Sequence, residues 1–238
     1  MKRKKIILPA VLAAAALLVT AGLLFYTGVW QWNRPSEETY PIRGVDVSHF
    51  QGKIDWDVLA GEDIRFAYIK ATEGTSFVDE RFAENWAGAA ETPLRIGAYH
   101  FFSFESAGDS QAEHFIRTVV PAADMMPPAV DVEPYGQHGE LTADVLAELG
   151  TLLRLLEAHY GTKPILYTTA AYAEPVHTAF PENGIWLRSI FGRPDGSIPW
   201  VLWQFSNRTK LRGYDGEERF IDVNVFAGTE DDFRHFGE

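Results

Sequence analysis

Short apolar runs alternate with polar turns along most of this chain. Eight such runs follow residue 43, and each has the length and the Val, Ile, Tyr or Phe content of a buried strand. They cover residues 44–47, 65–70, 95–101, 129–133, 164–167, 184–187, 201–205 and 220–225. Because successive side chains of a strand point to opposite faces, each run also sends its polar residues to one common face.

Between the earlier strand runs the apolar spacing changes to that of helices. Residues 109–120 and 142–160 each place their apolar side chains on one stripe, as an amphipathic helix requires. Gly161 is a natural stop for the second helix, and Asp79 is placed to cap a shorter one. After about Phe180 the helical pattern ends, and loops rich in Gly and Pro join the last strands.

This order of elements predicts the fold class. Strands that alternate with helices pair in parallel, and eight strands in one domain of about 200 residues indicate a closed or nearly closed barrel. Because the late helices are missing, we expect an α/β fold that is an irregular (β/α) barrel of about eight strands, antiparallel at its end. No internal repeat is visible.

The first 30 residues form a separate unit. Four basic residues at positions 2–5 precede an uncharged run over residues 6–30, which is long enough to cross a bilayer at about 20 residues per span. The basic flank should stay in the cytoplasm, leaving the body outside it, in the periplasm or extracellular space. The Val-Thr-Ala sequence at 19–21 offers a cleavage site, but the apolar run continues past it. We expect an uncleaved transmembrane anchor, and a secreted protein if cleavage occurs.

The domain boundaries follow from these patterns. Residues 1–30 are the anchor, residues 31–41 are polar and contain two prolines as a linker does, and residues 42–238 are the barrel domain. We expect the protein to be a monomer.

Composition removes several classes of function. The formal net charge of −12 includes the four basic residues of the tail, so the remainder is near −16 and lacks the basic footprint of a nucleic-acid-binding protein. The chain has no cysteine, which excludes disulfides, thiolate zinc sites and a Cys nucleophile. No His pair has ligand spacing near the carboxylates, so we expect neither a metal nor a cofactor.

A pair of carboxylates marks the end of the fourth strand. Asp131 and Glu133 lie two residues apart, so they share a face with Cα atoms about 6.6 Å apart. Each disfavours ionisation of the other, which allows one of them to hold a proton near neutral pH. Taken alone, the pair fits an acid/base site, a solvated strand end or a metal site.

Other strand ends supply matching groups. In a β/α barrel the active site lies at the C-terminal ends of the strands, where Asp46 and Asp222 would join the pair. Aromatic rings surround these carboxylates in the sequence, and carboxylates together with flat rings suit a sugar substrate.

The same stretches resemble the glycoside hydrolase family 25 lysozymes, the N-acetylmuramidases. The matching motifs occur in order over about residues 44–226: GVDVSHFQG at 44–52, FAYIKATEG at 66–74, GAYHFF at 97–102, PAVDVE at 128–133, LWQF at 202–205 and IDVN at 221–224. The resemblance implies an irregular β/α barrel that hydrolyses the β-1,4 bond between N-acetylmuramic acid and N-acetylglucosamine in peptidoglycan glycan strands.

The resemblance also implies roles for individual residues. Glu133 would be the general acid and Asp131 its partner, which stabilises the transition state or positions the substrate's acetamido group. Asp46 and Asp222 would be the other active-site carboxylates, and three rings would line the cleft: Tyr99, Tyr167 and Trp203. Strand spacing does not decide between retention and inversion, and we favour retention assisted by the acetamido group.

One segment departs from the family pattern. Residues 186–191 read WLRSIF, where the family often has a Trp-Ile-Ala type segment. Arg188 therefore either faces a carboxylate of the substrate or pairs with a neighbouring carboxylate of the protein.

Two other functions remain open from the sequence. The barrel would also suit a glycosidase that acts on another amino-sugar polymer such as chitin. An inactive cell-wall-binding module is the third possibility, and the intact Asp131/Glu133 pair argues against it.

Overall fold

Eight strands close into a barrel in the computed structural model, which describes residues 2–122, 124–135 and 139–238. The strands in barrel order are β1 (Arg43–Val47), β2 (Phe66–Glu73), β4 (Arg95–Phe101), β5 (Ala129–Val132), β6 (Ile165–Thr169), β7 (Ile185–Arg188), β8 (Trp200–Thr209) and β9 (Ile221–Phe226). β1 pairs with β2 on one side and with β9 on the other, which closes the circle. The two-residue strand β3 (Phe77–Val78) folds back onto β2.

The barrel changes direction at its end, as the sequence predicted. β1, β2 and β4 to β8 run in parallel, whereas β9 is antiparallel to both β8 and β1. An antiparallel pair needs only a short connection, so no helix is required between β8 and β9. The loop over residues 210–220 makes this connection and completes a β8–β9 hairpin.

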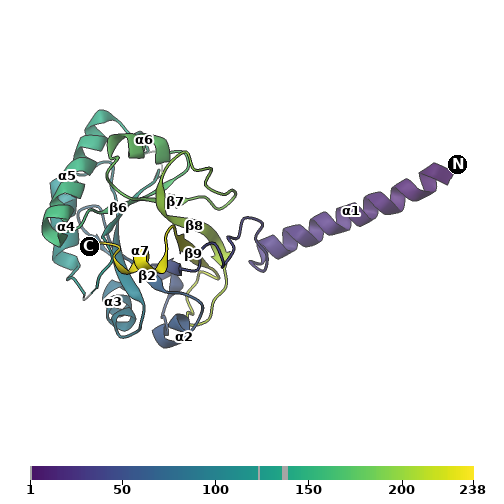
Figure 1. The fold of residues 1–238 in the computed structure, drawn as a ribbon, viewed down its shortest axis with the longest axis horizontal. Coiled ribbons are helices and arrows are strands. Elements are labelled where there is room, and N and C mark those ends of the chain that lie inside the picture. The colour runs from purple at the N-terminus through teal and green to yellow at the C-terminus, as the bar shows by residue number, and fades with distance from the viewer. Residues whose placement is uncertain (1, 123, 136–138) are drawn as a thin grey trace.

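Helices cover one side of the barrel more fully than the other (Figure 1). They are α2 (Trp56–Ala60), α3 (Phe82–Ala90), α4 (Gly108–Thr118), α5 (Ala143–Tyr160), α6 (Ala173–Ala179) and α7 (Glu230–Arg234), with a 3₁₀ turn η1 at His49–Gln51. α5 agrees closely with its prediction, since Thr142 caps its start and Gly161 ends it at a φ of 74°. The short helices α2, α6 and α7 were not predicted.

Aromatic side chains fill the barrel interior below its mouth. Tyr68, Tyr167 and Trp186 are buried there, with ring centroids of Tyr68 and Trp186 4.8 Å apart and those of Tyr167 and Trp186 5.0 Å apart. A second apolar layer lies between the strands and the helices, where the stripe of α5 packs. The packed interior leaves the C-terminal mouth of the barrel as the place for a site.

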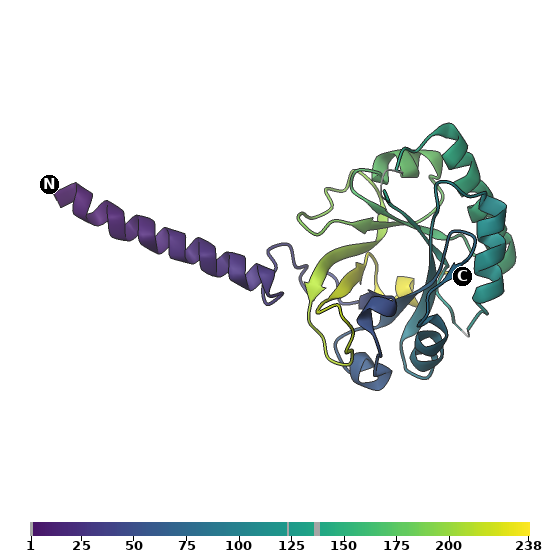
Figure 2. The same cartoon turned by 180° about the vertical axis from the view of Figure 1, so that it is seen from behind.

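A long helix, α1 (Lys2–Tyr26), projects from the barrel in Figures 1 and 2. Residues Pro9–Tyr26 of this helix have a mean hydropathy of 2.1, and none of them is buried. The length and composition of the helix therefore suffice for a membrane span or a signal sequence. Part of the segment predicted as a linker packs on the barrel: Asn33 is only 4% exposed. The boundaries at 30 and 41 stay a prediction.

Candidate active site

A cavity of about 320 Å³ opens at the C-terminal ends of the parallel strands. Its lining residues are Asp46, Val47, Ser48, Phe50, Gln51, Lys70, Tyr99, Phe101, Asp131, Glu133, Tyr167, Trp186, Asn207, Glu218, Phe220 and Asp222. The four carboxylates expected at the site, together with two of the three expected rings, therefore lie in one cavity. The strand ends bring together residues that are up to 176 positions apart in the sequence.

Two of the carboxylates are held by side-chain amides. Asp46 and Asp222 face each other across the β1–β9 ladder. Gln204 on β8 donates its Nε2 to Asp46 at 3.0 Å and to Asp222 at 3.0 Å, and Asn224 donates its Nδ2 to Asp46 at 2.7 Å. The Trp186 indole in turn donates to Asn224 Oδ1 at 2.7 Å. This network fixes the direction of the Asp46 carboxylate from three strands.

The other two carboxylates come from the end of β5. Asp131 lies between Phe101 and Tyr167 in strand register, is 8% exposed, and its Oδ1 has no hydrogen-bond partner among the residues that the structure describes. Glu133 follows the strand and is half-buried. A buried carboxylate oxygen that lines a cavity without a protein partner is available to a ligand.

Burial sets the protonation of this group. Desolvation raises the pKa of all four carboxyls, to about 6 for Asp46 and well above the usual range for Asp131 and Asp222. The neighbouring charge of Glu133 raises the pKa of Asp131 further, and Asp46 does the same to Asp222. The cavity can therefore hold a protonated carboxyl beside an ionised one near neutral pH.

Two cations moderate these pKa values. Lys70 lines the cavity, pairs with Glu73 at 2.9 Å, and lies 5.1 Å from the ring centroid of Phe101. Its charge lowers the pKa of Asp131 and of Glu133, and its place in the cavity was not anticipated from the sequence. Arg188 ends β7 outside the set of lining residues, yet its charge lowers the pKa of Glu133 and of the other three carboxyls.

The position of Trp203 corrects the sequence prediction. Trp203 is 1% exposed, belongs to the core outside the barrel wall, and donates its Nε1 to the Ser189 carbonyl at 3.0 Å. On β8 the next residue, Gln204, points into the barrel, so Trp203 must point the other way. Trp186 lines the cavity instead. Tyr167 lies where it was expected, and its hydroxyl donates to Gln204 Oε1 at 3.0 Å.

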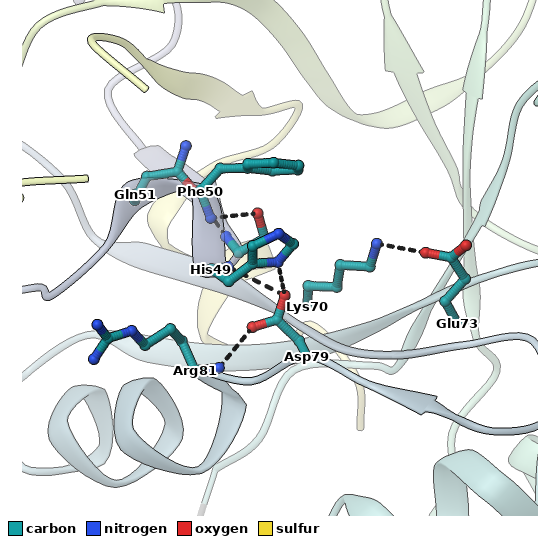
Figure 3. A network of polar contacts seen from close by, with 8 residues as sticks. His49, Phe50, Gln51, Lys70, Glu73, Asp79 and Arg81 are labelled. Carbon is teal, nitrogen blue, oxygen red and sulfur yellow. Dashed lines mark hydrogen bonds and ion pairs between the residues drawn. The ribbon is translucent and has the colours of Figure 1, made fainter. Parts of the chain in front are cut away.

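An exposed ring, Phe50, forms one wall of the cavity and is braced from behind (Figure 3). The His49 ring lies against Phe50, with centroids 4.1 Å apart. Asp79 Oδ2 accepts from the His49 backbone N–H at 3.1 Å and lies 2.7 Å from His49 Nδ1, while Asp79 Oδ1 accepts from the Arg81 N–H at 3.0 Å. The buried Asp79 thus ties η1 to the start of α3, and it does not cap that helix, whose first flanking residue is Arg81.

His100 is a structural residue. It is fully buried on β4, within 2.7 Å of the Thr72 hydroxyl and 3.1 Å of Gln111 Oε1, and burial lowers its pKa to about 4.

The chemistry open to this cavity is acid/base chemistry on a polar ligand. Within the described ranges, no group of three or more His, Asp or Glu side chains has an arrangement that would hold a metal ion. Carboxyls with raised pKa values can donate or accept protons, and the rings of Phe50, Tyr99 and Trp186 offer flat apolar surfaces.

Comparisons with known proteins agree with this geometry. The family model of the glycosyl hydrolases family 25 matches residues 45–214. The uncharacterized protein YegX of Escherichia coli O157:H7 is 37% identical over 207 residues, which are 83% of this chain and 74% of that protein. Lysozyme M1 of Streptomyces globisporus is 30% identical over 210 residues, which are 81% of this chain and 70% of that protein.

A solved structure is similar over most of its length. A family 25 glycosyl hydrolase from Bacillus anthracis superposes with a TM-score of 0.77 at 42% sequence identity, and the match covers 87% of this chain and 97% of the other.

Proposed function

This chain belongs to the glycosyl hydrolases family 25 and is a glycoside hydrolase, and we propose that it is a muramidase acting on peptidoglycan. The substrate bond is the β-1,4 linkage between N-acetylmuramic acid and N-acetylglucosamine. Support comes from Lysozyme M1, which is similar over 81% of this chain, and from the cavity, which combines carboxyls with flat rings.

The observation that carries the proposal is the Asp131/Glu133 pair. Both carboxyls line the cavity, and burial raises both pKa values. Glu133 is the more exposed of the two and can reach a ligand in the open part of the cavity, so it acts as the general acid that protonates the leaving glycosidic oxygen. Asp131 has one oxygen without a partner among the described residues; it faces the substrate and stabilises the positive charge that develops in the transition state.

The remaining residues hold and orient the sugar. Asp46 and Asp222, fixed by Gln204 and Asn224, accept hydrogen bonds from substrate hydroxyls or support Asp131. Tyr99 and Tyr167 line the substrate-binding wall, and Arg188 supplies positive charge at its edge. The reaction proceeds with retention assisted by the acetamido group. NMR of the first product formed identifies the anomer, and initial inversion contradicts this order of steps.

The proposed location places the barrel on the same side of the membrane as its substrate. α1 anchors the protein in the membrane with the barrel outside the cytoplasm, where peptidoglycan lies, and the protein acts as a monomer.

The full chain in mild detergent, incubated with isolated peptidoglycan, tests the activity. Mass spectrometry should identify muropeptides that end in reducing N-acetylmuramic acid. Glu133→Gln should lower their rate of release by about 10²–10⁴-fold, because the amide has no proton to donate. Glu91→Gln, the same change at an exposed residue that follows α3 outside the cavity, should keep the rate within a few fold. Release of oligosaccharides from chitin but not from peptidoglycan would make the protein a different glycosidase, and binding without release would make it a wall-binding module.

A further inference from the structure

The residues that follow α1 are built into the outside of the barrel. Asn33 is 4% exposed and donates its Nδ2 to the carbonyls of Phe205 at 3.1 Å and Ser189 at 3.2 Å. The Gln31 side-chain amide donates to the Ser206 hydroxyl. A buried amide that satisfies backbone carbonyls of β8 and of the loop after β7 fixes its own segment as well.

A second set of contacts holds the segment nearer to β1. Arg43 is 4% exposed and donates its Nη2 to the Pro35 carbonyl at 2.9 Å. The Tyr40 ring packs on Trp200 and Trp203, with centroids 5.6 Å and 6.3 Å away. Residues 31–43 are thus attached at both ends and in the middle, which is inconsistent with a freely moving tether.

The end of α1 lies beside the β8–β9 hairpin in both Figures 1 and 2. The Arg208 guanidinium on β8 lies 5.1 Å from the Tyr26 ring and 5.0 Å from the Phe220 ring. Asn33 follows Tyr26 by seven positions, and a fully extended chain of that length reaches about 25 Å at most. The docking point at Asn33 therefore stays close to the end of the apolar helix.

We propose that residues 31–43 form a strut that holds the barrel against the outer surface of the bilayer, with the β8–β9 hairpin facing the phospholipid headgroups. This inference rests on the proposed membrane span of α1. The family match begins at residue 45, so the strut lies outside the residues that the family model covers.

The strut has a consequence for the substrate. The hairpin that faces the headgroups also supplies four residues to the cavity: Asn207, Glu218, Phe220 and Asp222. One wall of the cavity therefore lies near the membrane surface. The enzyme acts on the glycan strands nearest the bilayer, and strands deeper in the wall lie beyond its reach.

Thiol cross-linking tests the docking, because the chain has no native cysteine. The double variant Gln31→Cys/Ser206→Cys, in full-length protein in native membranes, should form an intrachain cross-link with a short bifunctional thiol reagent. Gln31→Cys/Arg154→Cys, with the second thiol on the exposed face of α5, should not. Equal cross-linking of the two pairs, or none in the first, would contradict the strut.

A label on the hairpin tests its place at the membrane. Lys210→Cys and Arg154→Cys each remove one exposed cation and give one site for a fluorophore. In vesicles of phosphatidylcholine with phosphatidylglycerol, a quencher on the lipid headgroups should reduce the fluorescence at position 210 several-fold more than at position 154. Similar quenching at both positions would overturn the proposed orientation.

Extraction of the protein from membranes distinguishes failure of the strut from failure of the proposed activity. Alkaline carbonate should leave the full chain in the membrane fraction, and its release would overturn both the span and the strut. Muropeptide release by the detergent-solubilised chain reports the proposed activity alone, so either proposal can fail without the other.

Discussion

The amide of Gln204 is shared between two carboxyls that the β1–β9 ladder places side by side. Burial raises the pKa of both Asp46 and Asp222, and the charge of Asp46 raises that of Asp222 further, while the hydrogen bonds from Asn224 and Gln204 lower that of Asp46. The protein thus buries carboxyls at the site at a cost in free energy, which is a typical way in which active sites reduce fold stability.

Replacing one carboxyl should remove part of this cost. Asp222→Asn keeps an oxygen that accepts from Gln204 and replaces a buried carboxyl by a neutral amide, so the unfolding temperature at pH 7.5 should rise by a few degrees while muropeptide release falls. Thermal unfolding of the full chain in detergent measures the first effect. Asp215→Asn, at an exposed position of the hairpin loop, is the control. A lower unfolding temperature for Asp222→Asn would show that burying this carboxyl does not reduce stability.

Single residues also show which side-chain positions could be predicted from the sequence and which could not. The alternation rule brought Asp46, Asp131, Glu133 and Asp222 to one mouth because each follows a clear apolar run. The expectation that Trp203 lines the cleft came from the family resemblance and was wrong, since this run contains apolar residues on both faces and alternation alone did not decide which of them face inward. If Gln204 is assigned to the barrel interior, alternation along the strand places the Trp203 side chain outside the barrel.

At the scale of elements, the length of a helix determined whether it could be predicted from the sequence. The stripe of α5 spans five turns and has a polar cap and a glycine stop, so its bounds were predicted within one residue. α2, α6 and α7 have five to seven residues, too few for a periodic pattern. The tie between η1 and α3 joins residues about 30 positions apart, and no local pattern reports such a contact.

Gly161 at the end of α5 allows the cost of backbone strain to be measured without a change in packing. Gly161 has a φ of 74°, and an added Cβ would meet no atom within 4 Å. Gly161→Ala should therefore lower the free energy of unfolding by about 1 kcal/mol through backbone strain alone. Gly161→Asn should cost less, because Asn tolerates this conformation. Equal losses for the two variants in thermal unfolding would argue against a backbone origin.

Substitution of Asp79 should remove the support of the Phe50 ring, because Asp79 holds His49 and the His49 ring lies against Phe50. Asp79→Ala leaves the donors of His49 and Arg81 without their acceptor, which should cost about 1–3 kcal/mol of stability. The freed η1 should also raise KM for peptidoglycan more than it lowers kcat, since Phe50 lines the cavity wall and carries no group that could transfer a proton. Kinetics with soluble peptidoglycan fragments measure both constants. The exposed neighbour variant Glu80→Ala should change neither, and an unchanged KM in Asp79→Ala would remove Phe50 from the binding wall.

At the scale of the whole molecule, buried ionisable groups shape the dependence of stability on pH. His100 has a lowered pKa of about 4, so the folded state binds fewer protons than the unfolded state and stability rises with pH up to about 6.5. Asp46 has a raised pKa of about 6, so stability falls with pH over the range from about 4 to 6. The two effects oppose each other over most of that range.

Two further carboxyls add to the effect of Asp46. Burial raises the pKa of both Asp131 and Asp222 well above the usual range, so the folded state keeps their protons to a higher pH than the unfolded state does, and stability falls as pH rises towards their folded-state pKa values. The unfolding temperature of Asp222→Asn should therefore decline less with rising pH than that of the wild type. Identical pH profiles for the two proteins would show that Asp222 has an ordinary pKa.

The reversed direction of β9 also decides where the chain leaves the barrel. Because β9 starts at the mouth with Asp222, its far end and α7 lie at the opposite end, where Arg95 at the start of β4 donates to the carbonyls of Phe233 and Phe236. A fluorescent reporter or an affinity handle fused behind Glu238 would accordingly sit on the floor of the barrel. Such a fusion leaves both the catalytic opening and the lipid-facing side unobstructed, which suits imaging of the enzyme in living cells.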